Sequence, residues 1–218
     1  TRNLHSAILD LGSFDSSFWN TAFDFNWPRL FFGHAQPLIA LGAIFYKFWS
    51  SSVFLVFFQS VMLISGFFFL PFFSSSILKR PPIILPLAFL LYFPLWYNAL
   101  FDFHMDHLAV PLLFLFYYGC SKKKWWVACI SAMVLALVKE SFALVTVFCG
   151  VYLCVRQRRF GWGLITLLFG AIYFYVATCI LIPNVTFGIR GALDAGAFSW
   201  LGRTPFEMLI FIFTHPVT

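Results

Sequence analysis

The charged residues of this chain are sorted between two kinds of gap that separate long apolar runs. Three gaps hold cations without a carboxylate: Lys79-Arg80, Lys122-Lys123-Lys124 and Arg156-Arg158-Arg159. The eight acidic residues lie in other gaps: Asp10, Asp15, Asp24, Asp102, Asp106, Glu140, Asp194 and Glu207. Cytoplasmic loops of membrane proteins collect Lys and Arg. The pattern therefore predicts helices that alternate between a basic cytoplasmic face and an outer face that gathers the carboxylates.

The composition favours a membrane protein over a soluble one. Hydrophobic residues make up 61% of the chain and charged residues 10%, whereas a soluble domain carries about 25% charged residues. The net charge of +6 does not indicate a nucleic-acid partner, because eight of the fourteen Lys and Arg lie in the three basic gaps. The five cysteines have no paired spacing and are typical of buried apolar positions. We expect an all-α, polytopic transmembrane protein in contact with the lipid bilayer.

Apolar run lengths predict how the chain is divided. Residues 1–36 are too polar to cross a bilayer and are expected to form an outer loop, with an interfacial or re-entrant helix over 37–49. Membrane-embedded helices are expected over 53–75, 82–99, 107–120, 125–138, 141–155 and 161–182, followed by a second outer loop over 183–205. Both ends look cut, so we expect residues 1–218 to be one transmembrane domain of a longer protein.

Lys139-Glu140 interrupts the apolar stretch between two of the basic gaps. If both gaps are cytoplasmic, residues 125–138 and 141–155 form a hairpin whose arms are shorter than the ~20 residues of a normal span. Its tip would lie below the outer surface, facing protein or water. The alternative is one long tilted helix with an ion pair inside it. A lysine at a recessed tip is suited to bind a phosphate group, unless its neighbour Glu140 neutralises it.

Two acidic residues flank a glycine in LDLGSFDSSFWN, residues 9–20. A carboxylate in a partly dry pocket at a bilayer surface is suited to act as a general base, which makes Asp10 and Asp15 candidate catalytic residues. The alternative is that Asp10 caps a helix over 11–20 and that Asp15 is solvated.

The stretch FDFHMDH offers four side chains of the kinds that bind metals within six residues: Asp102, His104, Asp106 and His107. Such a set could hold a divalent metal near His104, Asp106 and His107, or orient a phosphate or a sugar hydroxyl. A structural cluster of hydrogen bonds is the alternative. Arg190 and Arg203 in the second outer loop are further candidates for anion binding, or are simply solvated.

Five stretches carry a resemblance to a known family: DLGSFDSSFWN, GHAQPLIALGAIFYKF, FDFHMDHLAVPLLFL, LALVKESFALV and LGRTPFEMLIFIFTHP. In this order they resemble a bacterial membrane family, domain of unknown function 2079, which is similar to the GT-C glycosyltransferases. The resemblance covers nearly the whole chain and implies a location in the bacterial inner membrane. The chain departs from the family at Met105-Asp106, where Pro-Glu is usual, and at Ser16, where Gln is frequent.

The similarity to GT-C enzymes implies a role for each candidate residue. Asp15 would correspond to the essential acid of the first outer loop, with Asp10 as second choice. Lys139 would meet the phosphate of a polyprenyl-phosphate sugar donor, and His104 and Asp106 would line the donor or acceptor pocket. The expected function is sugar transfer at the outer face. A transporter and a non-catalytic subunit, packed against partners in a larger membrane complex, are the alternatives.

Overall fold

The computed structural model describes residues 8–25, 27–31, 33–100, 102–186, 210–211 and 214. All regular structure in these residues is helical, which confirms the predicted all-α class. The main helices are α1 (Ile8–Trp19), α2 (Ile39–Tyr46), α3 (Ser52–Ser65), α4 (Leu70–Ser76), α5 (Ile84–Leu90), α6 (Phe93–Leu100), α7 (Ala109–Ser121), α8 (Trp125–Ala136), α9 (Glu140–Val155), α10 (Phe160–Val176) and α11 (Ile182–Thr186). Short helical turns are η1 (Asn20–Asp24), η2 (Trp27–Phe31), η3 (Gly66–Phe69), η4 (Met105–Leu108) and η5 (Ala177–Leu181).

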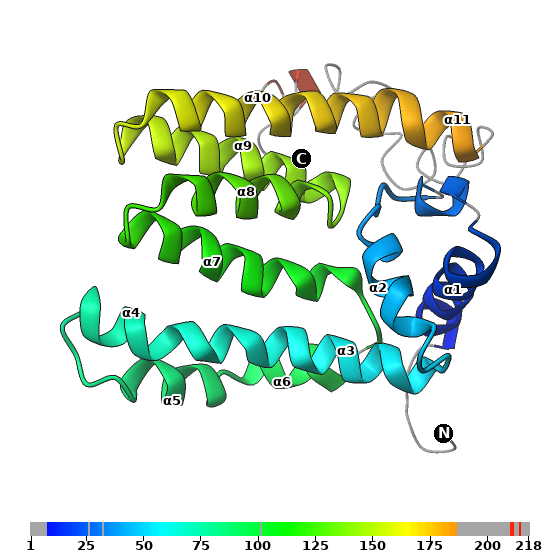
Figure 1. The fold of residues 1–218 in the computed structure, drawn as a ribbon, viewed down its shortest axis with the longest axis horizontal. Coiled ribbons are helices and arrows are strands. Elements are labelled where there is room, and N and C mark those ends of the chain that lie inside the picture. The colour runs from blue at the N-terminus through cyan, green and yellow to red at the C-terminus, as the bar shows by residue number, and fades with distance from the viewer. Residues whose placement is uncertain are drawn as a thin grey trace.

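The long helices lie side by side in a layered bundle (Figure 1). The first layer is α3 with α4, which η3 joins into one helical stretch, and α5 and α6 return alongside it. Helices α7, α8, α9 and α10 follow, each in contact with the next. Helices α1 and α2 pack against each other and lie across one end of the bundle.

Charge is separated along the bundle in the way that the sequence predicts. The turns α4–α5, α7–α8 and α9–α10, which carry the three basic clusters, all lie at the end opposite α1 and α2 (Figure 1). The acidic residues that the structure describes lie in α1, in η1, in the segment before α7 and at the start of α9. Asp194 and Glu207 lie outside the described residues. The bundle therefore has a basic end and a carboxylate end.

Two helical stretches of the described chain are long and apolar enough to cross a membrane. They are Ser52–Ser75, with 24 residues, and Phe160–Val185, with 26 residues. Large apolar side chains on both are open to the surroundings; Phe68, for example, is 77% exposed. An extensive exposed apolar surface of this kind is typical of contact with lipid or with another protein.

Residues 125–155 form a hairpin of two short helices. Helix α8 has 12 residues and α9 has 16, and Lys139 between them has extended backbone angles (φ −167°, ψ 151°) that interrupt the helix. The alternative of one long helix is therefore wrong. The two arms pack against each other, and Thr146 donates a hydrogen bond to the carbonyl of Ala132 across them (2.7 Å). The tip stops short of the ends of α3 and α10 (Figure 1).

Residues 82–99, expected as one helix, form two. Helix α5 ends at Leu90, and α6 begins at Phe93 with a proline, Pro94, in its first turn. The residue before a proline disfavours the α conformation and the proline lacks an N–H donor. A continuous helix would therefore lose hydrogen bonds here, and the chain breaks instead.

Helices α9 and α10 pack with their backbones close together. A Cβ atom added to Gly150 would lie 2.6 Å from the backbone nitrogen of Leu167, and one added to Gly170 would lie 2.8 Å from the carbonyl oxygen of Ala143. Small residues are common between membrane helices because they permit such approach. The glycines of these helices therefore set the spacing that holds α10 against the hairpin.

We predict that Gly150→Ala destabilises the protein. The new methyl group meets backbone rather than a movable side chain, so α9 and α10 must separate, at a cost of about 1–3 kcal/mol. The midpoint of thermal unfolding of the purified protein in detergent measures the effect. Gly161→Ala is the matched control, because a Cβ there meets no atom within 4 Å. Equal midpoints for the two variants would contradict the proposed close packing.

Candidate functional site

Glu140, the first residue of α9, attaches the hairpin tip to the segment before α2. Its Oε1 lies 2.7 Å from Nδ1 of His34, and its Oε2 accepts a hydrogen bond from the backbone N–H of Ala35 at 2.9 Å. The backbone N–H of Leu38 also donates to the carbonyl of Leu137 (3.4 Å). Burial by itself would raise the Glu140 pKa, but the hydrogen bond and charge of His34, with the two backbone N–H groups, hold it below its usual value. Glu140 is therefore a carboxylate that holds two segments together.

Lys139 extends from the same tip toward the segment before α7. Its Nζ lies 3.6 Å from Oδ2 of Asp106, and its side chain is 20% exposed. The second oxygen of Asp106, Oδ1, is buried and has no hydrogen-bond partner among the described residues. An ion pair of this length, with one acceptor unused, can exchange partners when an anion or a hydroxyl group arrives.

Gln59, in the middle of α3, supports the irregular segment that carries the acidic and histidine residues. Its Oε1 accepts a hydrogen bond from the backbone N–H of His104 (3.0 Å), and its Nε2 donates to the carbonyl of Asn98 (3.4 Å). A buried amide costs free energy unless it is paired. Gln59 is nearly fully buried, so these bonds fix both sides of the break between α6 and α7.

The two histidines of this segment use Nδ1 for backbone contacts. Nδ1 of His104 lies 3.0 Å from the carbonyl oxygen of Asp102, and Nδ1 of His107 lies 2.7 Å from the carbonyl oxygen of His104. A carbonyl can only accept, so each Nδ1 carries a hydrogen. In the neutral form of the His107 ring, Nε2 is therefore an acceptor.

The two candidate bases of α1 have different partners. Asp10 lies in the first turn of the helix, and its Oδ2 is 3.7 Å from Nε2 of His104. This contact is attractive only when His104 is doubly protonated, since Nδ1 already carries the single hydrogen of the neutral ring. Asp15 accepts a hydrogen bond from the hydroxyl of Tyr46 at 2.6 Å. Burial, with the bond to Asp15 and its charge, raises the Tyr46 pKa, so Tyr46 remains the donor.

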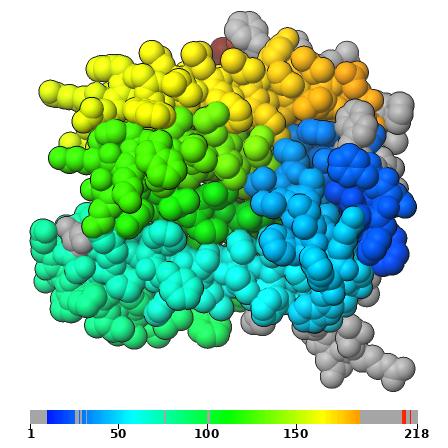
Figure 2. Space-filling model, in the orientation of Figure 1, coloured from blue at the N-terminus to red at the C-terminus, as the bar shows by residue number. Residues whose placement is uncertain are grey.

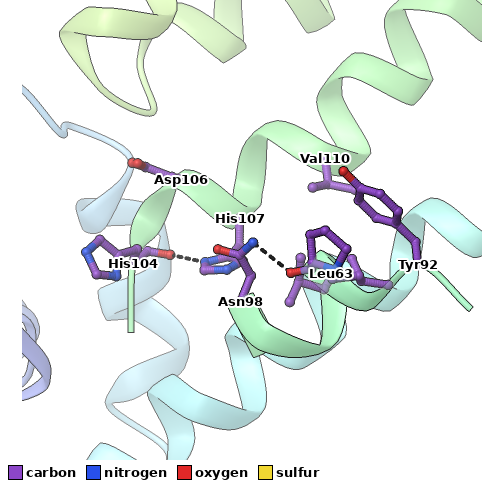
Figure 3. A pocket seen from close by; sticks show the side chains of 9 residues that line it. Leu63, Tyr92, Asn98, His104, Asp106, His107 and Val110 are labelled. Atoms are coloured by element: carbon purple, nitrogen blue, oxygen red, sulfur yellow. Dashed lines mark hydrogen bonds between the residues drawn. The ribbon is translucent and has the colours of Figure 1, made fainter. Parts of the chain in front are cut away.

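A pocket of about 440 Å³ lies beside these residues, between α3, α6 and the start of α7. Its apolar wall is formed by Leu63, Tyr92, Pro94, Leu95 and Val110, and its polar wall by Asn98, His104, Asp106 and His107. Figure 3 shows His104 and His107 joined by their hydrogen bond, Tyr92 on the side of Val110, and Asp106 pointing away from them. The pocket is thus amphipathic, and its volume falls within the ~300–1,000 Å³ of small-molecule sites.

The described residues do not form a metal site. No three His, Cys, Asp or Glu side chains in this part of the chain lie close enough together to hold an ion. His104 and His107 both direct Nδ1 to the backbone, and Asp106 turns toward Lys139. These contacts join the segment into a hydrogen-bonded cluster, and Asp102 contributes to it by accepting from the N–H of Phe103 (3.0 Å).

Several site residues were not singled out from the sequence, and two that were lie outside the described part. Gln59, His34 and Tyr46 bind His104, Glu140 and Asp15 respectively. Gln59 did leave a signal, because a lone amide inside a long apolar run requires a partner. Arg190 and Arg203, predicted to bind anions, fall outside the described residues.

The match to a family model covers the whole chain. Residues 1–218 match the model of the family described as "Predicted membrane protein (DUF2079)". The chain belongs to this family. No curated protein and no solved structure matches it. Family membership, the apolar composition and the two long apolar helices together identify a membrane protein with an all-helical fold.

We predict that Glu140→Gln lowers the free energy of unfolding by about 1–3 kcal/mol near neutral pH, since one buried charged acceptor is lost. The pKa of Glu140 is depressed in the fold, so its stabilisation is complete above the usual Glu pKa and is lost as the pH falls through the lowered value. Unfolding midpoints of wild type and variant should therefore converge only at a pH below the usual Glu pKa. Asp24→Asn, at an exposed site, is the control. A difference in unfolding midpoint between wild type and Glu140→Gln that does not change with pH would contradict the assignment.

Proposed function

We propose that this protein is an integral membrane glycosyltransferase that moves a sugar from a polyprenyl-phosphate donor to an acceptor hydroxyl. The reaction would take place at the carboxylate end of the bundle, which we assign to the outer face of a bacterial inner membrane crossed by several helices. The observation that carries the proposal is the Lys139–Asp106 pair at a recessed hairpin tip, beside an amphipathic pocket.

The pocket suits a substrate that is part lipid and part sugar. Tyr92, Leu95 and Val110 offer an apolar wall to the first units of an isoprenoid chain, while Asn98 and His107 offer polar contacts to hydroxyl groups. Asp106 Oδ1 is a buried acceptor without a partner in the described chain, a state that costs about 1–3 kcal/mol. A bound hydroxyl group would relieve this cost.

Lys139 would bind the donor phosphate in place of Asp106. Lysine is a compact cation that suits a phosphate group, and its contact with Asp106 is long enough, at 3.6 Å, to be exchanged. The acceptor oxygen would attack the anomeric carbon while its proton passes to a carboxylate. The bond between that carbon and the phosphate oxygen would break, and polyprenyl phosphate would leave with the electron pair, stabilised by Lys139.

Two carboxylates compete for the role of base. The family resemblance assigns it to Asp15, whose carboxylate is held by the Tyr46 hydroxyl. Asp10 is in contact with the pocket lining, since its partner His104 is part of the polar wall. We assign the role of base to Asp15. To Asp10 we assign the role of holding the His104 ring in its doubly protonated form.

The test is sugar transfer or release from radiolabelled polyprenyl-phosphate sugars by the purified full-length protein in nanodiscs. We expect Asp15→Asn to lower turnover by about 10²–10⁴-fold, the usual contribution of a general base. Lys139→Met should weaken use of the donor, while Lys139→Arg should retain part of it because the charge remains. Asp24→Asn serves as the control.

Two outcomes would revise the proposal in different ways. Full turnover in Asp15→Asn with loss in Asp10→Asn would transfer the base to Asp10 and leave the function standing. Absence of turnover with every common donor, in wild-type protein that unfolds cooperatively, would overturn the function.

A further inference from the structure

A second pocket lies at the basic end of the bundle, far along the helices from the candidate site. Its volume is about 570 Å³, and it lies between α4, α5, α7 and the end of α9. Phe73, Ile77 and Leu85 form an apolar wall on one side, and Tyr117 faces it from α7. Figure 2 shows the seam between the α3–α5 layer and α7, along which this pocket lies.

Lys123 is the cation in the lining of this pocket. It is exposed, and it lies in the tight turn between α7 and α8, where Lys124 N–H bonds the carbonyl of Gly119 (2.8 Å) and Lys123 N–H bonds that of Cys120 (3.1 Å). This pairing is the Schellman motif, whose penultimate position is left-handed and is usually glycine. Lys123 takes that position with φ of 56°.

A cationic residue takes the left-handed position in the other two basic turns as well. Lys79 has φ of 55° and Arg158 has φ of 52°, so each turn has a long cationic side chain where glycine would be unstrained. Within the described residues, none of these cations forms an ion pair with a carboxylate, because the described acids lie at the other end. Two other cations of the basic turns, Lys122 and Arg159, lie over the rings of Phe72 and Trp125 respectively. Lys123 is thus a strained, exposed cation at an apolar pocket.

The position of the pocket along the helices identifies the class of ligand. The apolar stretches Ser52–Ser75 and Phe160–Val185 end next to Lys79 and Arg159. In a bilayer crossed by these stretches, the basic turns would lie at the depth of the lipid headgroups. Basic pockets between membrane helices on the cytoplasmic side bind anionic headgroups. A soluble anion would use Lys123 but would leave the apolar wall uncovered.

We propose that this pocket binds an anionic phospholipid, with its phosphate at the Lys123 ammonium and an acyl chain along Phe73, Ile77 and Leu85. Gln157 adds a polar group at the rim and is fixed there by its hydrogen bond to the Tyr152 hydroxyl (3.0 Å). This site is separate from the carboxylate end, and it does not depend on the reaction proposed there.

The test is the thermal midpoint of the full-length protein in detergent, titrated with phosphatidylglycerol or with phosphatidylcholine. Phosphatidylglycerol should raise the wild-type midpoint more than phosphatidylcholine does. Lys123→Gly relaxes the backbone and should fold at least as well as wild type, yet require about fivefold more phosphatidylglycerol for the same shift. Leu85→Trp should also lower the response, because it fills the pocket and keeps the charge.

Lys79→Gly is the matched control, since it removes a left-handed cation that does not line the pocket. Its titration should follow that of the wild type. Equal losses in Lys79→Gly and Lys123→Gly would mean general surface attraction and would overturn the site, as would an unchanged response in Leu85→Trp. An equal shift with soluble glycerol phosphate, at the same concentration, would overturn the assignment to a lipid.

Discussion

The arrangement of the carboxylate end depends on one buried carboxylate at the hairpin tip. The Glu140 carboxylate accepts hydrogen bonds from the His34 ring and from the backbone N–H of Ala35. These bonds fix where the tip lies against the segment before α2. Because Lys139 precedes Glu140 directly, its approach to Asp106 follows from the same attachment. The hairpin, with arms of 12 and 16 residues, packs on α7 through α8 and on α10 through α9. The charged hydrogen bond of Glu140 adds the attachment of its tip to the segment before α2.

The features of the fold that follow from hydropathy and charge could be predicted from the sequence. The hairpin is one example, because Lys139-Glu140 between two basic clusters leaves few ways to keep those clusters on one side. The partners of its polar residues could not be predicted in this way. His34 lies 106 residues from Glu140, and Gln59 lies 45 residues from His104. Periodicity reports which face of a helix is apolar, but it carries no information on which distant polar groups meet.

The sequence indicated which residues belong to the candidate site, but not how their side chains are arranged. The FDFHMDH stretch suggested four convergent ligands, whereas the structure turns His104 and His107 to backbone carbonyls and Asp106 to Lys139. The reason is local, since a segment without regular helix must pair its own carbonyl groups when it is half buried. The break before Pro94 has a different local cause, because a proline lacks the N–H donor that a continuous helix requires. Pro94 and Asn98, which Gln59 binds, line the pocket, and no run of apolar residues predicts this wall.

The three left-handed cations imply that heat stability and orientation oppose each other in this protein. Each left-handed residue with a Cβ costs about 1–2 kcal/mol that glycine would recover. The same side chains belong to the positive charge that decides which side of a bilayer a loop remains on during insertion. A variant with glycine in all three turns would therefore gain resistance to heat but would keep only five of the eight cations of these turns, so less positive charge would hold the loops on one side of a membrane during insertion.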